Sequence, residues 1–181
     1  MISAPSAGTV YTIGHSTRTI SEFVKLLNES AVQVVVDVRS IPRSRRNPQF
    51  NLEVLPESLS GFAIGYEHAA ELGGRRRRPR EAPPSPNTFW RNESFRNYAD
   101  YAMTEPFRVG MARLRATAAR DRCAIMCSEA VWWRCHRRII SDYLLTEGFE
   151  VLHIMAERRI QAALLTPGAD KLLGGTLIYR G

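Results

Sequence analysis

Apolar residues fall along this chain in short runs of two kinds, one typical of buried strands and one typical of amphipathic helices. The segment 32–38 is nearly continuous β-branched sequence, as in a parallel strand that is covered on both faces. Phe23, Leu26 and Leu27 recur at helical spacing behind Thr19 and Glu22, which form a capping box. The same patterns predict further strands at 10–13, 62–66, 122–126 and 149–154, helices after Asn51 and at 93–103, 105–119 and 132–146, and a short helix with a glycine-rich tail over 155–181.

This alternation of strands and helices predicts an α/β fold, a single three-layer domain whose mostly parallel sheet carries helices on both faces. A chain of 181 residues has room for one well-cored domain. We place that domain at 10–167, between a flexible N-terminal tail at 1–9 and a C-terminal tail at 168–181. A basic, proline-rich loop at 71–88 interrupts it, and such long insertions are usually mobile or functional.

The charge of the chain points to anionic partners. Its formal net charge is +7, its sequence pI is about 9.8, and 23 of its 25 cationic side chains are arginine. Arginine grips phosphate or carboxylate with paired hydrogen bonds, so nucleic acid or a phosphorylated small molecule is an expected partner. The alternative is a codon bias that replaces lysine by arginine on an ordinary surface.

Neither a membrane segment nor an export signal is visible. No apolar run approaches the ~20 residues that span a bilayer, and the segment 1–10 lacks a basic start and an apolar core. Three cysteines, an odd number, suit reduced thiols better than a disulfide framework. We therefore predict a cytoplasmic protein without a membrane partner.

Polar side chains follow three of the predicted parallel strands, whose carboxyl ends share one edge of the sheet, so we expect them to converge on one ligand site. The candidate catalytic residues are His15, Asp37, Cys127, Glu129 and His136. The candidates at these strand ends for binding phosphate or nucleic acid are Ser16, Arg39, Arg43, Arg45 and Arg137.

Each catalytic candidate also has a structural interpretation. His15 would hydrogen-bond a neighbouring loop, and Asp37 would pair with one of the following arginines to hold the loop after its strand. Glu129 would cap the helix that follows it, where a carboxylate is favoured by the helix dipole. Cys127 would be an inert core residue, although a thiol that precedes a helix is also a candidate nucleophile.

Two sets of residues bear on metal binding. Cys127, Cys135 and His136 are zinc-ligand types, but Cys135 and His136 are neighbours on the predicted helix and would point about 100° apart. The chain has no Cys-x-x-Cys pair. The sequence therefore argues against a structural zinc site and leaves a divalent metal cofactor held by Asp37 and Glu129 as the alternative.

The arginine run at 75–80 is a second candidate binding element. Such charge runs are usually solvated, but its sign, its length and the nearby Phe89-Trp90-Arg91 favour a nucleic-acid contact. Arg75 and Arg76 therefore join the candidate residues for binding phosphate or nucleic acid.

Several segments together resemble a known family. They are Tyr11-Thr12-Ile13-Gly14-His15-Ser16, then Asp37-Val38-Arg39 with Pro42, Ser44 and Arg45, then Leu72-Gly73-Gly74, Cys127-Ser128-Glu129 and Cys135-His136-Arg137. In this order they resemble the bacterial family labelled domain of unknown function 488, over about residues 10 to 167, with Trp132 where relatives carry proline. The resemblance implies an α/β domain whose motifs converge on one pocket, and no established reaction.

Three functional hypotheses follow from these residues. The first is an enzyme, a hydrolase or transferase, acting on a phosphate-bearing substrate such as nucleic acid or a nucleotide. In it arginines hold the phosphate, and His15, Glu129 or His136 moves protons. The alternative is a non-catalytic nucleic-acid-binding module that uses the arginine-rich loop. The third is a small-ligand or redox sensor based on Cys127 and Cys135.

Overall fold

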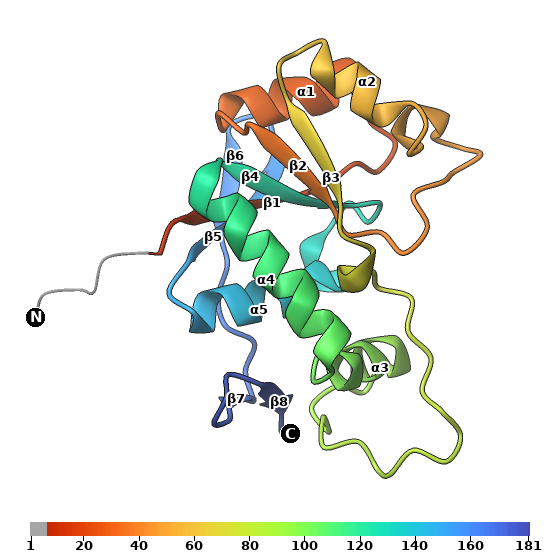
Figure 1. Ribbon diagram of the computed structural model, residues 1–181, viewed down its shortest axis with the longest axis vertical. Helices are drawn as coiled ribbons and strands as arrows, with labels where there is room; N and C mark the ends of the chain where they lie inside the picture. Colours follow the sequence, from red (N-terminus) through yellow and green to blue (C-terminus); the bar gives the residue numbers. More distant parts are fainter. Residues whose placement is uncertain (1–6) are drawn as a thin grey trace, which may run out of the picture.

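The computed structural model describes residues 7–181, and in them strands and helices alternate as the sequence predicts (Figure 1). The strands are β1 (Thr9–Gly14), β2 (Val34–Asp37), β3 (Gly65–His68), β4 (Cys123–Cys127), β5 (Glu150–Ala156), β6 (Arg159–Ala162), β7 (Ala169–Lys171) and β8 (Leu177–Tyr179). The α-helices are α1 (Ile20–Glu29), α2 (Leu55–Ser60), α3 (Glu93–Tyr101), α4 (Glu105–Arg120) and α5 (Arg137–Thr146), with short 3₁₀ helices η1 (Pro48–Phe50), η2 (Ala70–Leu72) and η3 (Trp132–Arg134).

Six strands form the central sheet in the order β3-β2-β4-β1-β5-β6. Strands β3, β2, β4, β1 and β5 are parallel to their neighbours, and β6 runs antiparallel to β5 at the edge. Strand β4 is buried at every position because it lies in the middle of the sheet between two helical layers. The predicted α/β class with a mostly parallel sheet is confirmed.

The two faces of the sheet carry separate apolar cores. Alternate side chains of the strands point to opposite faces, so Ile125 and Cys127 of β4 join one core while Met126 joins the other. Helices α1 and α2 cover the Met126 face, and α3, α4 and α5 cover the Cys127 face (Figure 1). The start of α1 has the predicted capping box, in which Thr19 and Glu22 satisfy each other's backbone N–H groups.

The predicted helix at 132–146 begins later than the apolar pattern suggested. Trp132–Arg134 forms the short 3₁₀ helix η3, Cys135 is extended, and α5 starts only at Arg137. The third strand also lies slightly later, at Gly65–His68 instead of 62–66. The change at Cys135 decides the geometry of the site described below.

Strands occupy the described parts of both predicted tails. Residues 1–6 lie outside the described residues, but the N–H of Ala7 already donates to the carbonyl oxygen of Gly148, and β1 starts at Thr9. The prediction of a short helix and a tail over 155–181 is wrong, because this segment contains β6, β7 and β8. Strands β7 and β8 form a two-stranded antiparallel sheet, and β8 is buried.

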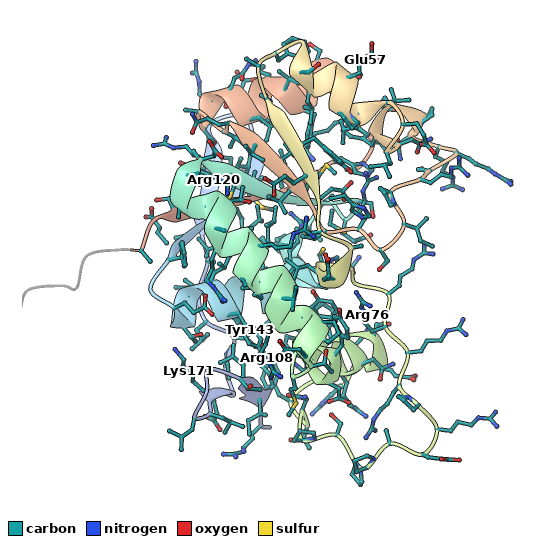
Figure 2. The ribbon with its side chains drawn as sticks, in the orientation of Figure 1. Glu57, Arg76, Arg108, Arg120, Tyr143 and Lys171 are labelled. Atoms are coloured by element: carbon teal, nitrogen blue, oxygen red, sulfur yellow. The ribbon has the colours of Figure 1, made fainter. Side chains whose placement is uncertain are left out.

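The C-terminal hairpin is fixed to α5 by polar contacts. The N–H of Leu177 donates to the Tyr143 hydroxyl at 3.1 Å, and the Tyr179 hydroxyl donates to Asp142 Oδ2 at 3.0 Å (Figure 2 shows Tyr143 beside the hairpin). Asp142 Oδ1 accepts from the N–H of Thr166 at 2.9 Å. Segment 163–181 therefore belongs to the domain.

Asp142→Asn is expected to change the pH dependence of stability. Burial raises the pKa of the Asp142 carboxyl to about 6, so the folded protein binds this proton more tightly than the unfolded chain. The resulting stabilisation is complete at low pH and is lost as pH rises through about 6. Urea unfolding measures this effect. The free energy of unfolding of the variant, relative to that of the wild type, should rise by up to about 3 kcal/mol between about pH 4 and pH 7.

The control for this experiment is Asp170→Asn, which removes an exposed carboxylate paired with Arg180 in the hairpin. It is expected to cost under about 1 kcal/mol, as surface ion pairs do. A constant difference between Asp142→Asn and the wild type across this pH range would contradict the assignment.

The basic loop that follows η2 is held against α3. Its Arg76 guanidinium lies over the ring of Tyr101, 3.7 Å from the ring centroid. Arg78 pairs with Asp100 at 3.4 Å, and the Ser85 hydroxyl also donates to Asp100. Among residues 7–181 no helix has the length and apolar character needed to cross a membrane.

Candidate functional site

One cavity of about 580 Å³ opens where β1, β2 and β4 end, at the edge at which the sequence predicted a ligand site. Eight predicted site residues line it: His15, Ser16, Arg39, Arg43, Arg75, Cys127, Glu129 and His136. The other four, Asp37, Arg45, Arg76 and Arg137, do not line it. The parallel sheet thus brings three strand ends and the loop after η2 to one hollow.

Close backbone approaches hold the walls of this cavity together. A Cβ on Gly14 would collide with the carbonyl oxygen of Glu129 and lie 2.7 Å from its carbonyl carbon. A Cβ on Gly74 would collide with His136 Nδ1 and lie 2.7 and 2.8 Å from the adjoining ring carbons, which places Gly74 against the face of the imidazole. The close contacts at both positions therefore explain why glycine, which has no Cβ, occupies them.

Asp37 is hydrogen-bonded to Arg39 and does not line the cavity. The Asp37 carboxylate is fully buried and accepts from Arg39 Nε at 2.9 Å and from Arg39 Nη2 at 2.6 Å. The Tyr66 hydroxyl donates to Asp37 Oδ2 at 2.7 Å. Because both carboxylate oxygens are occupied, the structure does not support a metal ion held between Asp37 and Glu129, and it shows the ion-pair interpretation of Asp37.

His15 orients the same arginine. Its ring stacks on Phe50 with centroids 4.2 Å apart, and its Nδ1 donates to the carbonyl oxygen of Ser16 at 2.9 Å. Nε2 is then unprotonated and accepts from Arg39 Nη1 at 3.2 Å. Burial lowers the pKa of His15 to about 4 and keeps the ring neutral near pH 7. Both ring nitrogens of His15 are therefore engaged, one with the backbone and one with Arg39.

Two thiols and an imidazole meet on one wall of the cavity. Cys127 Sγ, Cys135 Sγ and His136 Nδ1 all lie within 4.8 Å of one another. Nδ1 is 3.6 Å from Cys135 Sγ and 4.0 Å from Cys127 Sγ. His136 Nε2 donates to the carbonyl oxygen of Val38 at 2.8 Å, so in the neutral ring the Nδ1 lone pair is directed at the sulfurs. We call this group the Cys127–Cys135–His136 cluster.

The structure contradicts the geometric premise of the sequence-based argument against zinc at these residues. It placed Cys135 and His136 on one helix, where neighbouring side chains diverge. In the structure η3 ends at Arg134, and Cys135 has φ −123° and ψ 145°, an extended conformation. The side chains of Cys135 and His136 converge as a result, and both approach Cys127 from the next segment of chain.

Arg137 lies beneath this cluster and is 1% exposed. Its Nε donates to Cys135 Sγ at 3.3 Å, and its Nη2 donates to the carbonyl oxygen of Glu129 at 2.6 Å. No carboxylate within residues 7–181 forms an ion pair with it. Arg137 therefore contacts the cluster and does not line the cavity, and this geometry lends no support to its predicted role in binding phosphate.

The buried charge of Arg137 acts on the thiols. Burial alone would raise the pKa of Cys135, but a hydrogen bond with Cys127 and the Arg137 charge together lower it below the usual range. The same hydrogen bond and burial raise the pKa of Cys127. Cys135, which the sequence did not place among the catalytic candidates, is thus the sulfur that accepts a hydrogen bond from the buried guanidinium of Arg137.

The remaining predicted arginines differ in their surroundings. Arg43 lines the cavity and pairs with Glu53 at 3.0 Å. Arg45 is exposed and does not line the cavity. Arg76 donates to the carbonyl oxygens of Gly73 and Ala70, so it fixes the start of the loop. Neither Arg45 nor Arg76 is part of the cavity.

Among the lining residues that the sequence did not single out are Arg46, Arg134 and Tyr98. Arg46 and Arg134 belong to segments already singled out, and their charge was a usable signal. Tyr98 comes from α3, where it reads as part of an apolar stripe, yet its ring packs edge-on against His136 with centroids 5.0 Å apart. Its hydroxyl donates to the carbonyl oxygen of Leu72 at 2.7 Å.

The comparisons with known proteins bear on the family alone. No curated protein and no solved structure matches the chain significantly. The family model described as "Domain of unknown function DUF488" matches residues 19–144, which is more than half of the chain and includes the Cys127–Cys135–His136 cluster. The chain therefore belongs to the DUF488 family.

Proposed function

We propose that this protein is an enzyme that acts on a phosphate-bearing substrate of the nucleotide or nucleic-acid class, bound in the cavity at the end of β1, β2 and β4. The observation that carries the proposal is a set of three arginines, Arg46, Arg75 and Arg134. All three line the cavity, and their guanidinium groups make no hydrogen bond or ion pair with another residue in the described chain. Unpaired guanidinium groups around one hollow favour a phosphate ligand.

The charge balance of the lining supports the same ligand. The charge of Arg39 is matched by Asp37, and that of Arg43 by Glu53. Glu129 is the one carboxylate of the lining, and it has no partner among residues 7–181. The unpaired arginines therefore outnumber the unpaired acid, and the cavity has an excess of positive charge that attracts anions.

The dimensions of the site accommodate a ligand as large as a nucleotide. A volume of about 580 Å³ lies within the range of small-molecule sites. A second cavity, of about 1000 Å³, lies between the basic loop and α3 and shares Gly74, Arg75 and Ser94 with the first. A strand of nucleic acid that leaves the first cavity would enter the second along Arg75.

The groups on the lining suit hydrolysis. Arginines that hold a phosphate also stabilise the charge that develops on it in the transition state. Glu129 is exposed to the cavity and free of partners, so it is the group available to take a proton from an attacking water. Arg39 keeps one N–H free, because Asp37, the Phe50 carbonyl oxygen and His15 occupy the other four.

Arg46→Ala is expected to weaken the binding of a phosphate-bearing probe by about tenfold or more, because it removes charged hydrogen bonds to the phosphate. The matched control is Arg45→Ala, at the neighbouring exposed arginine that does not line the cavity. It should leave affinity nearly unchanged. Calorimetry with inorganic phosphate, a nucleoside monophosphate and a short single-stranded oligonucleotide measures the affinities and separates the ligand sources.

If Arg45→Ala and Arg46→Ala lowered the affinity for these probes equally, the proposal that the cavity binds them would be refuted. Assays for hydrolysis of the same probes, with and without added divalent metal, test the reaction. Tight binding without turnover would favour the non-catalytic nucleic-acid-binding module instead, and its affinity should then fall steeply with salt.

A further inference from the structure

We propose that Cys127, Cys135 and His136 bind one Zn²⁺ ion on the wall of the cavity. The first argument is distance. In a tetrahedral zinc site with ordinary bond lengths, sulfur and nitrogen ligands lie about 3.6 Å apart. His136 Nδ1 is 3.6 Å from Cys135 Sγ and 4.0 Å from Cys127 Sγ, so a small movement of Cys127 completes the geometry.

The second argument is the state of the imidazole. A histidine that ligates a metal usually donates its other N–H to a carbonyl or carboxylate, which fixes the tautomer and the ring orientation. His136 Nε2 donates such a hydrogen bond to the carbonyl oxygen of Val38 at 2.8 Å. The ring of Tyr98 and the backbone of Gly74 pack against the imidazole. The Nδ1 lone pair is held toward the two sulfurs with no other partner among the described residues.

The third argument is the charge around the sulfurs. Zinc binds thiolate and not thiol. The buried Arg137 has no carboxylate partner within residues 7–181, and it donates to Cys135 Sγ at 3.3 Å. A buried cation requires a compensating anion nearby. The thiolate ligands of a bound zinc ion would supply that negative charge 3.3 Å from the Arg137 guanidinium.

The donor set selects the metal. Two thiolates and one imidazole are soft to borderline ligands, and in this number they suit zinc in preference to Mg²⁺ or Ca²⁺, which take oxygen. Three protein ligands also leave one tetrahedral position open, as in catalytic zinc sites with two cysteines and one histidine. The three ligands line the cavity, so a zinc ion held by them would lie at the wall of the space in which we propose that the substrate binds.

A water in that open position would share the cavity with Glu129, whose carboxylate has no partner in the described chain. Zinc lowers the pKa of a bound water, and Glu129 would accept the proton that the water releases. This consequence rests on the proposed function, whereas the zinc site itself does not, because metal binding needs no substrate.

The test is the zinc content of the full-length chain, purified without chelators and measured by mass spectrometry. About one zinc per chain is expected for the wild type, as in other closed or catalytic single-zinc sites. Cys127→Ala, Cys135→Ala and His136→Ala should each lower zinc affinity by at least about 100-fold, because removing a ligand costs more than disturbing its surroundings. Cys123→Ala is the matched control, since Cys123 is buried in the same strand outside the cluster, and it should keep its zinc.

Two further measurements keep the proposal open to refutation if a variant does not fold. Replacement of zinc by Co²⁺ in the wild type should give the visible spectrum of a tetrahedral site with sulfur ligands. Thiol titration of denatured, unreduced protein should find three free thiols. The proposed site would be overturned if the wild type took up no more zinc than Cys127→Ala. It would also be overturned if the titration found one free thiol and a disulfide between Cys127 and Cys135. Zinc binding without any turnover would overturn the proposed function alone.

Discussion

Asp37→Ala is expected to lower the free energy of unfolding by about 3–5 kcal/mol, the largest effect we anticipate from a single charge deletion. The change leaves the guanidinium of Arg39, which is 6% exposed, without the carboxylate that accepts from its Nε and Nη2. The same change removes the acceptor of the Tyr66 hydroxyl. An unpaired charge in the interior is costly because water no longer solvates it. Urea unfolding followed by circular dichroism measures the loss.

A surface ion pair between an arginine and a carboxylate provides the comparison. Arg43 and Glu53 are 3.0 Å apart, but their side chains are 72% and 60% exposed. Glu53→Ala should therefore cost no more than about 1 kcal/mol. If Asp37→Ala cost as little as Glu53→Ala, Arg39 would have to find another acceptor, and the structural role of Asp37 would be refuted.

The sequence predicted the sheet well because its strands carry their signal locally. Val34–Asp37 and Cys123–Cys127 are apolar runs, and runs of this kind are typical of strands buried on both faces. The C-terminal strands lack such a signal. Strand β6 is exposed throughout, and β7 and β8 have three residues each, so they depend on docking against α5 and not on their own pattern.

The candidate site was predictable in position and less so in detail. Parallel strand ends meet at one edge whatever the loops do, and this rule located His15, Arg39, Cys127 and Glu129 around one cavity. The roles depended on dihedral angles and contacts that no local pattern encodes. One extended residue, Cys135, turned two diverging side chains into a cluster, and the buried partners of Asp37 and Arg137 took both residues out of the cavity.

Gly14→Ala is expected to damage the site more than any other substitution outside the cluster and the cavity lining. The added Cβ would collide with the carbonyl oxygen of Glu129 and lie 2.9 Å from the Cα of Ala130. These are backbone atoms, so relief requires the whole segment after β4 to move. That segment carries Glu129, whose carbonyl oxygen accepts a hydrogen bond from Arg137. Arg137 in turn donates a hydrogen bond to Cys135 Sγ. A displacement of this kind can cost about 100-fold in function, with overpacking adding about 1–3 kcal/mol of destabilisation.

The matched control is Gly61→Ala. Gly61 ends α2 with ordinary helical angles, and a Cβ there would have only the carbonyl oxygen of Ser58 within 4 Å, at 3.7 Å. That change should be neutral or slightly stabilising, because alanine restricts the unfolded chain more than glycine does. Zinc content, affinity for a phosphate probe and unfolding free energy are to be measured for both variants. If Gly14→Ala matched Gly61→Ala in all three, the segment after β4 would be freely adjustable, and the rigid contact between β1 and the cluster would play no part in the site.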